Sequence, residues 1–148
     1  MAFTRLNRIP DPLNTLVVAA AICIDTSGRI LLGRRRPTKK NAGLWELPGG
    51  KVESEETAPE ALVRELREEL GIESRIIRHY MDSASPTQTG TLLLTCFLVE
   101  LHNPAVQSTD HDLLQWYSPH ELARVVSDEG LVSLPDIPVL KQLLVDCN

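Results

Sequence analysis

Three glutamates carry the chemistry that the sequence indicates most directly. Glu65, Glu68 and Glu69 stand at positions i, i+3 and i+4 of a segment with helical periodicity, so they share one face of the expected helix. Like charges at this spacing destabilise an isolated helix by roughly 0.2–0.5 kcal/mol per pair. A divalent cation would remove that repulsion, which makes this face a candidate metal site. The alternative is a solvated amphipathic helix in which Arg64 pairs with Glu60 and Glu68.

The helix that carries these acids is bounded by capping signals. Thr57 followed by Glu60 is a capping box, and Pro59 lies in the first turn, where its missing N–H costs little. Gly71 can take the left-handed conformation that ends many helices. The spacing predicts an amphipathic helix between Thr57 and Gly71. Its apolar stripe, which can pack on a core, consists of Leu62, Val63, Leu66 and Leu70.

The stretch 50–72 follows a longer pattern, which resembles the Nudix box of the Nudix hydrolases. The residues that carry the resemblance are Gly50, Glu56, Arg64, Glu65, Leu66, Glu68, Glu69, Gly71 and Ile72. A motif of this length is far more specific than a lone glycine-rich triplet. The resemblance implies an α/β fold, the family's α/β/α sandwich with a mixed β-sheet, whereas periodicity alone predicts only an α+β protein.

The resemblance also implies an enzyme that uses Mg²⁺, or alternatively Mn²⁺, to hydrolyse a nucleoside triphosphate to a nucleoside monophosphate and pyrophosphate. Such chemistry needs mainly positioning and charge neutralisation, and hard oxygen ligands suit these cations. The implied metal ligands are the carboxylates of Glu65, Glu68 and Glu69 and the carbonyl of Gly49. Glu65 is the first choice for the general base, and Asp110 is its competitor.

Basic residues near the box are candidates for holding phosphate. In the MutT-like branch of the family an arginine at the end of the second strand contacts phosphate, and Arg35 best matches that place. Lys51 is implied to face the phosphates. A solvated basic loop is the better explanation for most of the other cations between residues 34 and 40. Glu56 and Arg64 are expected to form an ion pair that orients the box loop and the helix.

An acidic residue outside the box is a further candidate. MutT-like relatives carry an acid six positions before a tryptophan, where it contributes to metal binding or to proton removal, and Asp110 stands six before Trp116. Asp112 is the substitute. The alternative is an aspartate that stabilises a turn. Because the family usually has the longer glutamate here, Asp110 could reach the metal through a water molecule.

Asp136, near the start of the last expected helix, bears on substrate choice. It could act as a helix N-cap, but MutT-like enzymes carry an asparagine here that reads the base, and relatives that act on cytosine nucleotides carry an aspartate. An ionised aspartate only accepts hydrogen bonds, and cytosine and 8-oxoguanine both present N–H donors. The resemblance places 8-oxo-dGTP first, which implies nucleotide-pool sanitation, and CTP or a modified dCTP second. A non-catalytic nucleotide-binding sensor is the alternative of another class.

Composition and charge argue against several other classes. The net charge of −5 disfavours a nucleic-acid polymer as the main partner, because such binding depends on basic faces. The three cysteines show no CxxC spacing and the four histidines no HExxH spacing, so the sequence has neither motif for zinc. The longest apolar run, Leu16 to Ile24, is too short to span a bilayer. We expect a cytoplasmic protein with no membrane partner, and the oligomeric state stays open.

The chain suits a single domain. Its 148 residues, 43% of them hydrophobic, are ordinary for one core. We expect an N-terminal arm at 1–14 and one domain over 15–148. The expected order is β-β-β-α-β-β-β-α-α. Besides the box helix and the segment that leads into it, this order has strands at 16–24, 29–33, 73–82, 91–101 and 115–117 and helices at 119–126 and 134–146.

Overall fold

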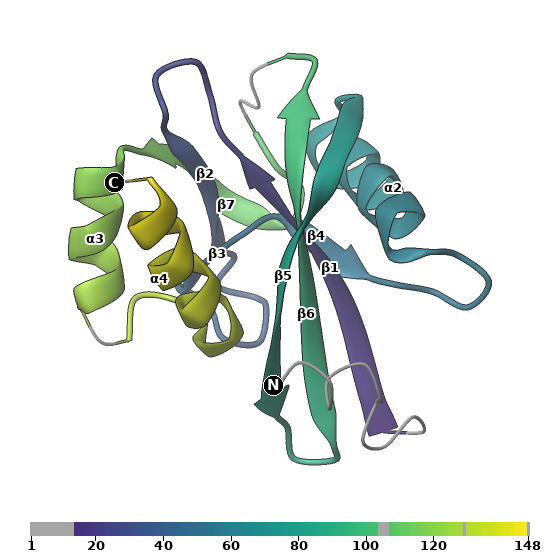
Figure 1. The fold of residues 1–148 in the computed structure, drawn as a ribbon. Helices are drawn as coiled ribbons and strands as arrows, with labels where there is room; N and C mark the ends of the chain where they lie inside the picture. The colour runs from purple at the N-terminus through teal and green to yellow at the C-terminus, as the bar shows by residue number, and fades with distance from the viewer. Residues whose placement is uncertain (1–13, 104–106, 129, 148) are drawn as a thin grey trace.

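The computed structural model describes residues 14–103, 107–128 and 130–147, which form two sheets flanked by helices (Figure 1). The four-stranded sheet has the order β4-β1-β6-β5 and the three-stranded sheet the order β3-β2-β7. The strands are β1 Thr15–Cys23, β2 Ile30–Arg35, β3 Trp45–Glu46, β4 Gly49–Lys51, β5 Ser74–Pro86, β6 Thr91–Leu101 and β7 His111–Tyr117. The helices are α2 Ala58–Leu70, α3 Pro119–Ser127 and α4 Ile137–Asp146, with a 3₁₀ turn, η2, at Leu134–Asp136.

The larger sheet is mixed, because β1 runs parallel to β6 and antiparallel to β4. Helix α2 lies on one side of the strands, and α3 and α4 lie on the other (Figure 1). Successive residues of β1 point into different cores: Ala20 and Ile22 pack in the core that contains residues of α3 and α4, whereas Ala19 and Ala21 pack in the core that contains residues of α2. The predicted α/β/α sandwich with a mixed sheet is confirmed.

The box helix forms as its local signals predict. The Thr57 side chain accepts a hydrogen bond from the Glu60 N–H, and the Glu60 side chain accepts one from the Thr57 N–H. Gly71 ends the helix with φ 68°. Leu62 and Leu66 are fully buried. These contacts fix the position of the helix, so that its acidic face is directed toward the neighbouring loops.

Other boundaries differ from those expected. The single strand expected before the box is divided into β3 and β4, which belong to different sheets. Between them the Pro48 carbonyl accepts a hydrogen bond from the Ala21 N–H at 2.8 Å, so the chain crosses from one sheet to the other. Strand β7 begins at His111 rather than at 115, and α4 begins at Ile137 after the η2 turn.

Apart from Asn14, the expected N-terminal arm lies outside the described residues. Within the described residues, no helix is long and apolar enough to cross a membrane.

Candidate active site

Three carboxylates meet between α2 and the loop that leads into β7. Glu65 and Glu69 lie one turn apart on α2, and Asp110 lies on the loop. One oxygen from each residue lies within 4.8 Å of the others. The Thr109 N–H donates a hydrogen bond to the Glu69 carbonyl at 3.0 Å, which holds the loop against the end of the helix. The structure therefore brings two predicted ligands on the helix together with the predicted loop acid.

The cluster is electrostatically costly as it stands. Glu69 is only 5% exposed, and its Oε2 has no hydrogen-bond partner among the described residues. Burial, with a smaller effect from Asp110, raises the pKa of Glu69 to about 10. Burial also raises the pKa of Glu65, whereas hydrogen bonding to Glu69 lowers the pKa of Asp110. Crowded, buried carboxylates require a proton or a cation, and these oxygen donors fit a hard divalent cation.

Gly49 and Gly50, at the start of β4, allow the backbone to approach this cluster closely. A Cβ at Gly50 would overlap the carboxyl group of Glu65, and a Cβ at Gly49 would overlap the Ala19 carbonyl of β1. A side chain at either place would therefore push β4 away from its neighbours. The role of the Gly49 carbonyl as a metal ligand stays a prediction.

Arg64 ties the helix to the box loop. Its guanidinium lies 2.6 Å from Glu56 Oε1, 2.9 Å from Glu65 Oε1 and 3.1 Å from the Lys51 carbonyl. The hydrogen bonds to Glu56 are the main reason that the pKa of Arg64 is raised. The ion pair expected between Glu56 and Arg64 is present.

Glu68 lies at the edge of the site rather than in the cluster. Its side chain is 61% exposed and lies 3.3 Å from the Arg64 guanidinium. The alternative in which Arg64 also pairs with Glu60 is wrong, because the Glu60 carboxylate completes the capping box instead. Sharing a helical face thus did not bring Glu65, Glu68 and Glu69 together, and the metal role of Glu68 stays a prediction.

The predicted phosphate-binding residues lie around the same region. Arg35 donates to the Lys40 carbonyl at 2.8 Å and lies 3.2 Å from Glu46 Oε2. Its positive charge is one of the effects that lower the pKa of Asp110, after the larger effect of Glu69. Lys51 is exposed on β4. Contact of either residue with phosphate stays a prediction.

Asp136 is buried, with 4% of its surface exposed, although it carries a carboxyl group. It occupies the N-cap position of α4 but makes no side-chain capping hydrogen bond. Instead its Oδ2 accepts a hydrogen bond from the Leu47 N–H at 2.8 Å. Burial raises its pKa to about 7. Asp136 is therefore connected to the segment between β3 and β4, and a role in reading the base stays a prediction.

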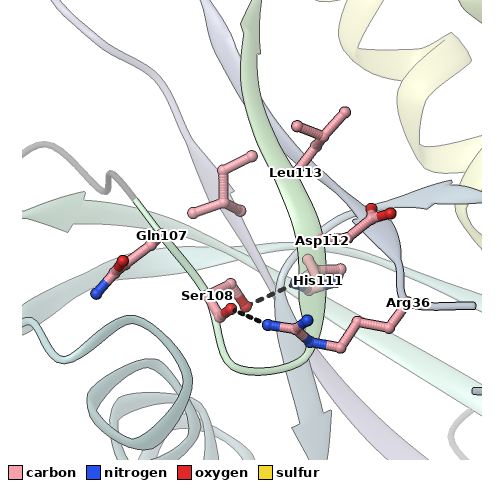
Figure 2. Close-up of a pocket in the computed structure, with 7 residues that line it drawn as sticks. Arg36, Gln107, Ser108, His111, Asp112 and Leu113 are labelled. Atoms are coloured by element: carbon pink, nitrogen blue, oxygen red, sulfur yellow. Dashed lines mark hydrogen bonds between the residues drawn. The ribbon is translucent and has the colours of Figure 1, made fainter. Parts of the chain in front are cut away.

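Sequence reasoning missed a buried polar chain behind Asp110. His111 lies between Ser108 and Glu46, with Nδ1 3.0 Å from Ser108 Oγ and Nε2 2.9 Å from Glu46 Oε2. Figure 2 shows Ser108 on the loop before β7 and His111 at the start of the strand, with Arg36 reaching the same loop. The sequence signal was Gly33, because a glycine inside a strand often marks a close approach, and here a Cβ at Gly33 would overlap the His111 ring.

Comparison with known proteins agrees with this geometry. The NUDIX domain family matches residues 14–135. Over 133 residues the chain is 38% identical to the CTP pyrophosphohydrolase of Escherichia coli (strain K12), covering 89% of this chain and 93% of that protein. It is 37% identical over 128 residues to "Putative 8-oxo-dGTP diphosphatase 2" of Mycobacterium tuberculosis (strain ATCC 25618 / H37Rv), covering 82% and 87%. The solution structure of the E. coli ORF135 protein superposes with a TM-score of 0.71 at 32% identity, covering 89% of this chain and 90% of that chain.

A mixed α/β sandwich with carboxylates gathered on the box helix defines a hydrolase of the Nudix class. The chain belongs to the Nudix hydrolase family, in its MutT-like branch. The resemblance seen in the box is thereby confirmed.

Proposed function

We propose that this protein is a Mg²⁺-dependent nucleoside triphosphate pyrophosphohydrolase, with Mn²⁺ as an alternative cation. The observation that carries the proposal is the cluster of Glu65, Glu69 and Asp110, whose most buried member has an unpartnered carboxylate oxygen. Removing water from such charges is costly unless a cation compensates them. A site of this kind suits a polyphosphate substrate, which the cation would also neutralise.

Glu65, Glu69 and Asp110 would hold the cation, with Glu68 and the Gly49 carbonyl as the further ligands implied by the family. When bound, the cation supplies charge neutralisation at the phosphates and lowers the pKa of the attacking water. These ligands hold the reacting groups in place, and one of them must also accept a proton.

Glu65 is the proposed general base, because burial raises its pKa while hydrogen bonding to Glu69 lowers the pKa of Asp110. A pKa raised toward the working pH favours proton transfer, and Glu65, unlike the buried Glu69, is partly exposed and therefore accessible to water. Arg35 and Lys51 are proposed to hold the phosphates, and Arg64 orients Glu65 through the contact between their side chains.

The substrate that Asp136 favours best is a cytosine nucleoside triphosphate. In its ionised form, which a pKa of about 7 makes available near neutral pH, the Asp136 carboxylate accepts hydrogen bonds, and cytosine presents an exocyclic amino group where uracil presents a carbonyl. The E. coli relative that matches this chain over most of its length is a CTP pyrophosphohydrolase. 8-Oxo-dGTP, the first expectation from the sequence, is the second candidate, because it also presents N–H donors and the M. tuberculosis relative carries that name.

A substrate panel tests the proposal. CTP, dCTP, 5-methyl-dCTP, UTP, dGTP and 8-oxo-dGTP are assayed with Mg²⁺ for the release of pyrophosphate and of phosphate. We expect pyrophosphate release with kcat/KM for CTP about 10- to 100-fold above that for UTP, the size of one mismatched hydrogen-bonding position. In Asp136→Ala this ratio should fall toward one.

Three results would contradict the proposal. Turnover that persists in excess chelator would exclude the metal mechanism, and release of phosphate alone would exclude attack between the α- and β-phosphates. Nucleotide binding without any product would identify a sensor domain. Preference for 8-oxo-dGTP over every cytosine nucleotide would instead select the second candidate.

A further inference from the structure

We propose that His111 is a positioning residue that links Asp110, on the loop, to Arg35, at the end of β2. The inference rests on the proposed function, because it assigns His111 a part in placing a metal ligand and a phosphate-binding arginine. The side chain of His111 is 1% exposed. A buried imidazole with a partner on each nitrogen is held in one orientation, and a ring held in this way can transmit the position of one partner to the other.

With a neutral imidazole, the hydrogen bonds through His111 have one consistent direction. The Glu46 carboxylate only accepts, so the His111 Nε2–H must donate to it. In the neutral ring Nδ1 then accepts, and the Ser108 hydroxyl must donate to it. The Ser108 oxygen is left to accept the backbone N–H of Asp110, which lies 3.1 Å away. Each polar group in this hydrogen-bond network therefore has a partner, as a buried network requires.

The strand order of the smaller sheet makes this link possible. Gly33 on β2 pairs with Glu46 of β3 on one side and with Leu114 of β7 on the other. A Cβ at Gly33 would overlap the imidazole of His111. The missing side chain therefore leaves room for the ring to cross β2 from β7 and reach Glu46, which also contacts Arg35 at 3.2 Å.

Other contacts hold the loop without making this link. Arg36 donates to the Thr109 carbonyl at 2.6 Å and to the Ser108 carbonyl at 3.0 Å, as Figure 2 shows for Ser108. The Thr109 N–H is bonded to the Glu69 carbonyl. These bonds fix the backbone of the loop, whereas the His111 chain connects the Asp110 N–H to Glu46 and Arg35.

Two substitutions of His111 distinguish the two ends of the hydrogen-bond network, one at Ser108 and the other at Glu46. A glutamine amide can take the place of Nε2, so His111→Gln keeps the Glu46 contact and loses Ser108. An asparagine amide can take the place of Nδ1, so His111→Asn keeps the Ser108 contact and loses Glu46. We expect His111→Gln, like Ser108→Ala, to raise the Kd for Mn²⁺ of the nucleotide-free protein about tenfold in calorimetry, in line with losses of residues that orient metal ligands.

His111→Asn should instead leave the Mn²⁺ affinity near that of the wild type and raise KM for the nucleoside triphosphate, because Glu46 no longer has its imidazole partner and Arg35 loses its fixed position. Gly33→Ala should displace the ring and produce both defects. His120→Asn, in an exposed histidine on α3, is the matched control and should change neither quantity.

The inference is overturned if both His111 variants keep the wild-type Kd for Mn²⁺ and the wild-type KM while only their melting temperatures fall, since His111 would then merely fill space. Failure of the proposed function looks different. In that case the wild type releases no pyrophosphate from any nucleotide, yet His111→Gln still weakens Mn²⁺ binding, which supports the positioning of Asp110.

Discussion

At the scale of single residues, Glu69 lowers the stability of the fold but suits the proposed metal site. It is buried beside Asp110, and burial raises its pKa to about 10. A glutamate in such a place lowers stability unless a proton or a cation compensates it. The sequence keeps an acid where an apolar residue would pack more favourably, and the metal site proposed here accounts for that cost.

Glu69→Gln tests this account. The amide has nearly the same shape but no charge, so we expect kcat to fall about 10²-fold or more, the usual effect of removing one well-placed electrostatic group. The melting temperature of the metal-free protein should stay the same or rise, because a costly buried acid is removed. Glu73→Gln, in an exposed carboxylate that pairs with Arg67, is the control. A large loss of metal-free stability would show that Glu69 is needed for folding.

Asp136 makes a prediction about pH. Its pKa is raised by burial from 3.8 to about 7, so the folded state holds a proton that the unfolded state releases between these values. Stability from this group is fully present below about pH 4, and it declines as pH rises toward 7. Asp136→Asn removes the titration. Urea unfolding at pH 5 and pH 7.5 should show a smaller loss of unfolding free energy in the variant than in the wild type, and equal losses would contradict the raised pKa.

At the scale of elements, the site depends on how closely β4 and α2 approach. The glycine at position 50 leaves space for the Glu65 carboxyl group, and Arg64 bonds both Glu65 and the Lys51 carbonyl of β4. The helix and the strand therefore form one unit around the proposed base. A change at their contact should affect activity more than stability.

Two glycine substitutions separate these effects. Gly50→Ala introduces a Cβ that must displace Glu65, so we expect kcat to fall at least tenfold. Gly71→Ala places an alanine at φ 68° with open space around its Cβ, which should cost about 1 kcal/mol of stability. The activity of Gly71→Ala should be close to that of the wild type below its melting temperature. Equal losses of activity in the two variants would argue against a specific contact at Gly50.

At the scale of the whole molecule, the site joins parts of the chain that are distant in sequence. Glu65 and Glu69 come from α2, which packs against one core, and Asp110 comes from the loop before β7 in the smaller sheet. A cation held by all three would crosslink α2 to that loop. Binding and folding are then thermodynamically linked.

Metal binding should therefore raise the melting temperature. At a free Mn²⁺ or Mg²⁺ concentration of about 100 Kd the native state gains about 2.7 kcal/mol. For a chain of this size that gain corresponds to a rise of several degrees in differential scanning calorimetry. Glu69→Gln should abolish the rise, and an unchanged transition in the wild type would show that the cluster holds no cation.

Local patterns were sufficient for the box helix. Its caps, its apolar stripe and the Glu56–Arg64 pair depend on residues within a few turns of one another. The structure has the caps, the pair and three members of the stripe, whereas Val63 is only half-buried and lies outside the core. The family, and with it the layered fold, followed from the same stretch. Asp110 could be selected only by resemblance, because nothing local distinguishes it from an ordinary loop aspartate.

The tertiary structure alone decided which acids meet. Helical spacing places Glu65, Glu68 and Glu69 on one face, but a face is wide, and the position of the β7 loop brings Asp110 to Glu65 and Glu69 and leaves Glu68 at the exposed edge. The contact between His111 and Gly33 likewise depends on strand pairing, not on spacing along the chain. The sequence thus determined the elements that are stabilised by local interactions. Which side chains are buried and which pair with one another depends on contacts between distant segments, and the stabilisation from such contacts cannot be inferred from a local sequence pattern.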